Sequence, residues 1–164
     1  MPSQKDVATP RCKGKRNPKR LGEHAESVFL ERAIGEGFAV AKPWGESDRY
    51  DFVVDAGGRF WRIQVKSSNQ TWGGRYGCYG VMAHSLRYGG GKRGYTPSEI
   101  DILAAYIAPE KLWYIIPIRA VGAALNIKIY TYARNPQNRG HPRAHNFELY
   151  REAWWVLNGE EPPV

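Results

Sequence analysis

The pattern of apolar and polar positions along the 164-residue chain changes its period several times, and each change predicts an element. Over residues 21–37, apolar side chains recur every three or four positions, which predicts a helix ending at the glycines there. Short apolar or alternating runs between turn-forming residues predict strands. Strands are expected at residues 38–41, 79–83, 100–107, 112–118 and 126–132, a hairpin within 49–68, a short helix at 119–125 and a closing helix at 147–157.

The segment RYDFVVDAGGRFWRIQVKSS, residues 49–68, has the clearest pattern. Two β-rich runs flank Ala56-Gly57-Gly58, which is typical of a hairpin. Successive strand side chains point to opposite faces, so the second run is expected to bury one face and to present polar groups on the other. The apolar face would carry Trp61, Ile63 and Val65, and the polar face Arg62, Gln64 and Lys66.

A hairpin with its tip at Gly57 would place Asp51 opposite Ile63 or Gln64. A carboxylate, an amide oxygen and a lysine would then converge on one polar patch, a set of groups suited to a divalent metal and a phosphate. Asp48 and Asp55 are rival carboxylates. Asp48 precedes the strand, and Asp55 stands at the turn, where aspartate is common for backbone reasons.

The spacing of Asp51 and the run Gln64-Val65-Lys66 resembles the PD-(D/E)xK nuclease core, in which an Asp begins one strand and an acid-x-Lys lies on the next. Gln stands here in place of the usual acid. The group I intron-encoded homing endonucleases of this type also carry Gln, and the chain is similar to them in its Gly-Glu pair early in a helix and its Pro-x-Gly segment before Arg-Tyr-Asp. Arg-Tyr replaces the Pro of the family name. The resemblance extends over residues 21–118.

The resemblance implies an α/β (α+β) fold with a restriction-endonuclease-like core, a central mixed β-sheet flanked by helices. It also implies a metal-dependent, site-specific endonuclease that cuts double-stranded DNA with Mg²⁺, for which Mn²⁺ would substitute. One such centre cuts one strand, so a homodimer or homotetramer is expected. The expected catalytic residues are Glu23, Asp51, Gln64 and Lys66, and the expected metal ligands are Asp51, Gln64, the Val65 carbonyl, Glu23 and Glu26.

Two glutamates compete for the acidic position on the helix. Glu23 and Glu26 are three residues apart and lie near each other on a helix surface. Glu23 follows Gly22 and matches the Gly-Glu pair of the family, so it is favoured first, although either side chain could face the metal.

Composition and charge add an expected domain organisation. Aromatic residues make up 13% of the chain, and its formal net charge is +8. Most of this excess of positive charge lies in residues 1–20. This segment is expected to be a basic flexible arm that either contacts phosphate or is simply solvated. Residues 21–158 would form a single nuclease domain, followed by a frayed tail at 159–164.

The cysteines and the hydropathy of the chain suggest where it works. Cys12 and Cys78 form no disulfide framework or metal-binding pair, and no apolar run approaches the length of a membrane span. A bacterial-type cytoplasmic, nucleoid-associated protein with no membrane contact is expected. His141 and His145 flank Pro142, which argues against a helix that would hold both on one face around zinc.

Several basic and polar segments are candidate DNA contacts. The glycine-rich segment 67–80 is either a loop that approaches DNA or a bend whose aromatics cover the sheet, and the segments 84–98 and 134–145 are expected to be basic loops. The candidate DNA-binding residues are Ser67, Ser68, Arg75, Arg87, Lys92, Arg93, Arg139 and Arg143. Asp101, embedded among apolar residues, needs a partner. A structural hydrogen bond is expected, with a helper role at the site as the alternative.

Two alternatives to a homing endonuclease remain open. The same core also serves Holliday-junction resolution, restriction and repair, and the shape of the preferred substrate would distinguish these tasks. Gln64 is the main argument for a non-catalytic DNA-binding module with a degenerate site.

Overall fold

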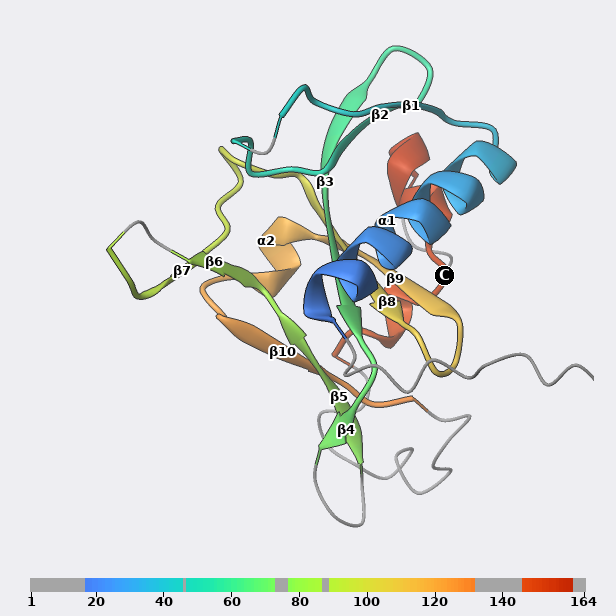
Figure 1. Ribbon diagram of the computed structural model, residues 1–164. Helices are drawn as coiled ribbons and strands as arrows, with labels where there is room; N and C mark the ends of the chain where they lie inside the picture. Colours follow the sequence, from blue (N-terminus) through green and yellow to red (C-terminus); the bar gives the residue numbers. More distant parts are fainter. Residues whose placement is uncertain (1–16, 46, 73–76, 87–88, 132–145, 161–164) are drawn as a thin grey trace, which may run out of the picture.

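The computed structural model describes residues 17–45, 47–72, 77–86, 89–131 and 146–160. Its central sheet has five strands in the order β1-β2-β3-β8-β9 (Figure 1). They are β1 (Ala39–Ala41), β2 (Phe52–Asp55), β3 (Phe60–Ser68), β8 (Ile102–Ile107) and β9 (Leu112–Pro117). Only β3 and β8 pair in parallel, so the expected mixed sheet is confirmed.

Smaller elements surround this sheet. A second sheet has the order β10-β5-β4, and two further strands form a separate ribbon. These strands are β4 (Thr71–Trp72), β5 (Cys78–Met82) and β10 (Asn126–Ile129), with β6 (His84–Leu86) and β7 (Lys92–Gly94) in the ribbon. The helices are α1 (Pro18–Gly35), the short α2 (Ile118–Val121) and the 3₁₀ helices η2 (Glu148–Tyr150) and η3 (Trp154–Asn158). None of the described helices is both long and apolar enough to span a membrane.

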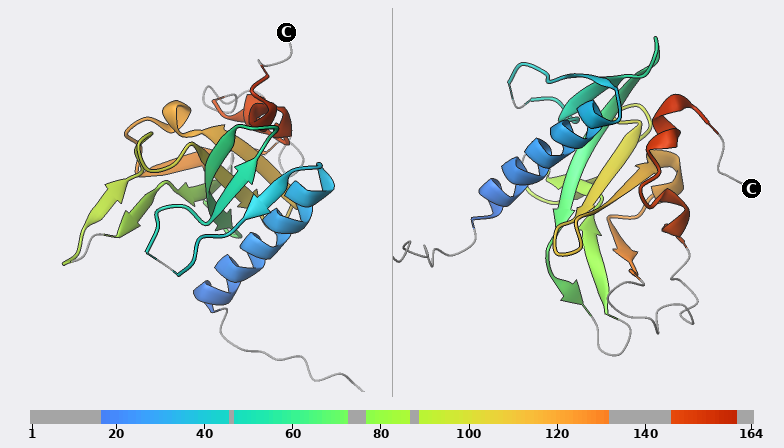
Figure 2. Two further views of the ribbon diagram at one scale, coloured as in Figure 1. Left: turned by 90° about the horizontal axis from the view of Figure 1, so that it is seen from above. Right: turned by 90° about the vertical axis from the view of Figure 1, so that its right-hand side faces the viewer.

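The central sheet is buried on both faces. One face packs against α1 and η3 around Phe29. The centre of the Phe29 ring lies 5.3 Å from that of Phe52, on which it stacks, and 5.5 Å from that of Trp113, which it meets edge-on. The other face packs against β5, β10 and α2. Figure 2 (left) shows α1 and the second sheet on opposite sides of the central strands. Helices therefore flank one face as expected, whereas the opposite face is covered largely by strands.

Helix α1 begins at Pro18, inside the segment expected to be a flexible arm. The Asn17 side chain caps it by accepting a hydrogen bond from the Lys19 backbone N–H at 3.0 Å, and proline suits the first helical position. The helix buries Ala25, Phe29 and Ala33, which recur at four-residue spacing. The predicted helix is therefore confirmed, with its start three residues earlier than expected.

The hairpin of β2 and β3 has the predicted faces. Trp61, Ile63 and Val65 all belong to the core under α1. The last paired residues of the hairpin are Phe52 and Ile63, and β3 then continues to Ser68. Beyond Ile63, β3 therefore continues without β2 beside it. We call the point where the two strands separate, at Asp51 on one side and residues 64–66 on the other, the fork, and it positions the candidate site.

Three predictions about the other segments need correction. The expected closing α-helix is two 3₁₀ helices joined by residues 151–153. Arg151 in this link forms a bridge to Tyr114, and Trp154 and Leu157 are buried. The segment 84–98, expected to be a loop, contains the β6–β7 ribbon. Strand β3 runs on into segment 67–80, where β4 pairs with β5. In each case long-range pairing overrides the local pattern.

Candidate active site

Asp51 lies at the fork between β2 and β3 and is tied to β3 by three hydrogen bonds. Its backbone N–H donates to the Ile63 carbonyl at 2.8 Å. Its Oδ2 accepts from the Val65 backbone N–H at 2.7 Å and from Gln64 Nε2 at 2.5 Å. The predicted convergence of Asp51 with Gln64 is therefore present, and the Val65 backbone adds to it.

The electrostatic environment of Asp51 disfavours its charged form. Burial raises the pKa of this carboxyl from 3.8 to about 6, and the charge of Glu26 acts in the same direction. The Val65 N–H and the ammonium groups of Lys66 and Lys42 act against this rise. Because burial and Glu26 disfavour the ionised form of this carboxyl, a cation beside it would stabilise that form.

Gln64 is buried, and its amide nitrogen lies where two oxygen atoms meet. Nε2 donates to Asp51 Oδ2 at 2.5 Å and to the Val65 carbonyl at 3.2 Å. A half-turn about the last side-chain bond would instead present Oε1 beside these two oxygens. A carboxylate, a carbonyl and an amide oxygen form a hard-ligand set that suits Mg²⁺ or Mn²⁺. In the described part of the chain, no group of three or more His, Cys, Asp or Glu side chains is placed to hold a metal.

Lys66 is half-buried on the same face of β3 as Gln64. Burial lowers the pKa of its ammonium group, while the charges of Asp51 and Glu26 act in the opposite direction. Its Nζ lies 5.7 Å from the centre of the Tyr95 ring. The lysine thus has an aromatic face nearby as well as two carboxylates.

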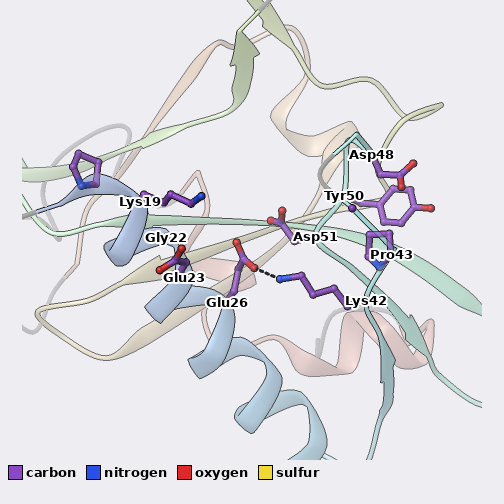
Figure 3. Close-up of a pocket in the computed structure, with 11 residues that line it drawn as sticks. Lys19, Gly22, Glu23, Glu26, Lys42, Pro43, Asp48, Tyr50 and Asp51 are labelled. Atoms are coloured by element: carbon purple, nitrogen blue, oxygen red, sulfur yellow. Dashed lines mark hydrogen bonds and ion pairs between the residues drawn. The ribbon is translucent and has the colours of Figure 1, made fainter.

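The two candidate glutamates of α1 differ in their surroundings. Glu26 is half-buried, and its Oε2 accepts from Lys42 Nζ at 2.7 Å. Its charge acts on both Asp51 and Lys66. Figure 3 shows Glu26 pointing toward Asp51 and Lys42, whereas Glu23 lies nearer to Lys19. Glu23 is exposed, so the structure brings Glu26, rather than the favoured Glu23, to the fork.

Two adjoining hollows open at the fork. The first, of about 370 Å³, lies between α1 and the loop after β1 and is lined by both glutamates and Asp51 (Figure 3). The second, of about 320 Å³, is lined by Gln64, Val65 and Lys66. Glu26 and Asp51 line both hollows, so the two share these carboxylates.

The rival aspartates do not contact Gln64 or the Val65 backbone as Asp51 does, although Asp48 also lines the first hollow. Asp48 is exposed and points away from Asp51 (Figure 3). Asp55 accepts from the Gly58 N–H at 2.9 Å in the hairpin turn. The expected structural role of Asp101 is confirmed, because its carboxylate accepts from the Arg62 backbone N–H at 2.9 Å and pairs with the guanidinium.

The candidate DNA contacts are spread over several places. Ser67 is half-buried and lines the second hollow, whereas Ser68 is buried at 6% exposure. Lys92 is exposed on the β6–β7 ribbon, and Arg93 beside it pairs with Glu99. The remaining four, Arg75, Arg87, Arg139 and Arg143, lie outside the described residues, as do Cys12, His141 and His145.

Sequence reasoning missed two neighbours of the site. Lys42, directly after β1, pairs with Glu26, and only the fold brings it there. Tyr95 lies in a segment expected to be a basic loop, and no spacing pattern connects it with Lys66.

Comparison with known proteins gives two findings. The sequence model of a PD-(D/E)XK endonuclease family matches residues 16–153. Among solved structures, the bacterial homing endonuclease I-Ssp6803I is similar, with a TM-score of 0.70 and 25% sequence identity over 89% of this chain and 95% of that one. No curated protein matches the sequence of this chain.

Proposed function

This chain belongs to the PD-(D/E)XK endonuclease family, and we propose that it is a metal-dependent, site-specific DNA endonuclease of the homing type. The observation that carries the proposal is the set of groups at the β2–β3 fork. Asp51 is hydrogen-bonded to Gln64 and to the Val65 backbone, and the charges of Lys66 and Glu26 act on it. A duplex phosphodiester is the proposed substrate, as the similarity to a homing endonuclease suggests.

The proposed metal ligands are Asp51 Oδ2, the Val65 carbonyl and the Gln64 amide oxygen after its half-turn. Support comes from the two oxygens that already meet at the Gln64 amide and from the raised pKa of Asp51. Glu26 is the proposed fourth contributor and the second acidic one. A Mg²⁺ or Mn²⁺ ion held there would supply positive charge to the phosphate being cleaved.

Lys66 has the proposed role of stabilising the reacting phosphate. Its ammonium lies in the field of Asp51 and Glu26, so it can orient an attacking water molecule by hydrogen bonding and offset the negative charge that builds on the phosphoryl oxygens. Asp51 and Glu26 in turn favour the protonated form of the lysine against the effect of burial.

The choice between the two glutamates can be tested directly. Glu26→Gln is expected to lower kcat by about 100-fold or more, whereas Glu23→Gln is expected to remain within about threefold of the wild type. Both substitutions remove one carboxylate from the same helix, so each serves as the control for the other. Equal losses would contradict the assignment.

We further propose that two or more copies act together on one target. A single centre of this kind hydrolyses one strand, so a double-strand break by a homing enzyme requires a second copy. Sedimentation of the protein with and without its target duplex would measure the number of copies.

The decisive experiment is cleavage of a randomised duplex library with Mg²⁺ or Mn²⁺, comparing the wild type with Lys66→Ala. Enrichment of one broken sequence by the wild type is expected, with none by Lys66→Ala. Asp55→Asn serves as a matched control that should still cleave, because Asp55 lines neither hollow and asparagine can keep the hydrogen bond from the Gly58 N–H. If bound duplexes stay intact while branched junctions are cut, the homing assignment is wrong. If neither substrate is cut, the chain is a DNA-binding module.

A further inference from the structure

Tyr95 occupies a buried position directly after the β6–β7 ribbon. Its side chain is 6% exposed and belongs to the core between the central and second sheets. Its backbone N–H donates to the Ala83 carbonyl at 3.4 Å, and the neighbouring Gly94 pairs with His84 at the base of the ribbon. The ring is therefore fixed by core packing, and the backbone that carries it is fixed by the pairing of Gly94 and Tyr95 with residues 83 and 84.

The ring of Tyr95 faces the proposed catalytic lysine. Lys66 Nζ lies 5.7 Å from the ring centre, within the range of a cation–π contact. On the sheet, Lys66 lies beside Ala105, which shares a core with Tyr95. Because the Ala105 side chain is a single methyl group, it leaves room on this face for both the lysine chain and the ring.

The lysine needs a support of this kind for its proposed task. Its side chain has four rotatable bonds, and the ammonium must stay within reach of the phosphate rather than swing into the open hollow. The charges of Asp51 and Glu26 attract it from the site. An aromatic face contacts the ammonium without accepting its protons in a directed hydrogen bond, so the N–H groups stay available for substrate.

We propose that Tyr95 is a positioning residue that holds the Lys66 ammonium at the fork through the face of its ring. The proposal rests on the proposed function of Lys66. It assigns the task to the ring and not to the phenol hydroxyl, so phenylalanine should replace tyrosine and a non-aromatic side chain of similar size should not.

The test compares Tyr95→Phe with Tyr95→Leu in the full chain, both first checked for cooperative thermal unfolding. The leucine variant is expected to lower kcat by about 2- to 30-fold, with the KM for DNA changed less than about twofold. The phenylalanine variant should stay within about twofold of the wild-type kcat. A second readout needs no activity: the NMR shift of the Lys66 ε-methylene group, assigned with Lys66→Arg, should carry a ring-current displacement in the wild type and Tyr95→Phe and lose it in Tyr95→Leu.

The two readouts separate this inference from the function on which it rests. An equal loss of kcat in both variants would assign the effect to the hydroxyl and overturn the inference, as would a leucine variant with full kcat. A wild type that cleaves DNA without a ring-current displacement at Lys66 overturns the inference alone. A displaced resonance in a wild type that cuts no DNA supports the contact and overturns the proposed function instead.

Discussion

Replacing Asp51 by asparagine is expected to stabilise the metal-free protein while abolishing cleavage. The carboxylate is buried at the fork, and Glu26 adds a like charge to its surroundings. Asparagine has nearly the same shape, and its Oδ1 can still accept from the Val65 N–H and from the Gln64 amide. The substitution therefore removes a costly charge and keeps the hydrogen bonds of the site.

The pKa of Asp51 sets the magnitude and the pH range of this effect. Its folded-state pKa of about 6 lies above the ordinary value of 3.8, so the folded protein binds the proton more tightly than the unfolded chain. The free energy of unfolding of the wild type therefore falls as the pH rises from about 4 to about 6 and is constant, in this contribution, at higher pH. The difference in pKa corresponds to about 3 kcal/mol, which is an upper bound because the side chain keeps some contact with water.

The assay is urea unfolding in EDTA at pH 4.5, 6 and 8. Asp51→Asn should exceed the wild type by about 1–3 kcal/mol at pH 8, and the gap should shrink toward pH 4.5. Asp48→Asn, at an exposed position, is the control and should change stability by less than about 0.5 kcal/mol. A gap that does not depend on pH, or an asparagine variant less stable than the wild type at pH 8, would refute the reasoning.

Three other substitutions probe other parts of the structure. Gln64→Glu places a second carboxylate beside Asp51, so calorimetry should show metal binding about tenfold tighter; unchanged affinity would contradict the proposed ligand set. Asp101→Asn weakens the pair with Arg62 and should cost about 1–3 kcal/mol in urea unfolding with kcat preserved; a loss of kcat in the folded variant would place Asp101 in the chemistry. Lys92→Ala should reduce the slope of log Kd against log salt by about 1, without changing the target sequence; an unchanged slope would remove Lys92 from the DNA interface.

The hairpin was predictable because its information is local. The turn glycines fix its tip, and the two-residue period of β3 assigns Trp61, Ile63 and Val65 to the core. Once the faces and the tip are fixed, the position of Asp51 opposite Ile63 and Gln64 follows. The convergence of carboxylate and amide could therefore be derived from residues 49–68 alone.

Elements that depend on distant partners could not be derived in this way. The C-terminal segment has apolar residues at helical spacing, yet Glu152 holds an extended connection by accepting from the Trp113 N–H at 2.7 Å. Its backbone adopts a φ of 49°, which a continuous α-helix does not allow. The ribbon likewise depends on pairing between two short strands of weak β pattern. Neither contact leaves a signal in the local sequence.

Which of Glu23 and Glu26 faces the fork could be predicted in part, because the helical period of the apolar residues fixes the buried side of α1. Successive residues of an α-helix are rotated by about 100°, and Ala25 and Phe29 mark the buried side of α1. Phe29 is the middle residue of the buried set Ala25, Phe29 and Ala33. Measured around the axis from Phe29, Glu26 lies at about 60°, at the border of the buried side, whereas Glu23 lies at about 120°. Motif matching favoured Glu23 because it follows a glycine, but the side chain that faces the fork is decided by which residues pack on the sheet. The burial pattern of α1 is therefore a better guide than the Gly-Glu pair to which carboxylate faces the fork, and Glu26 is for this reason the proposed one.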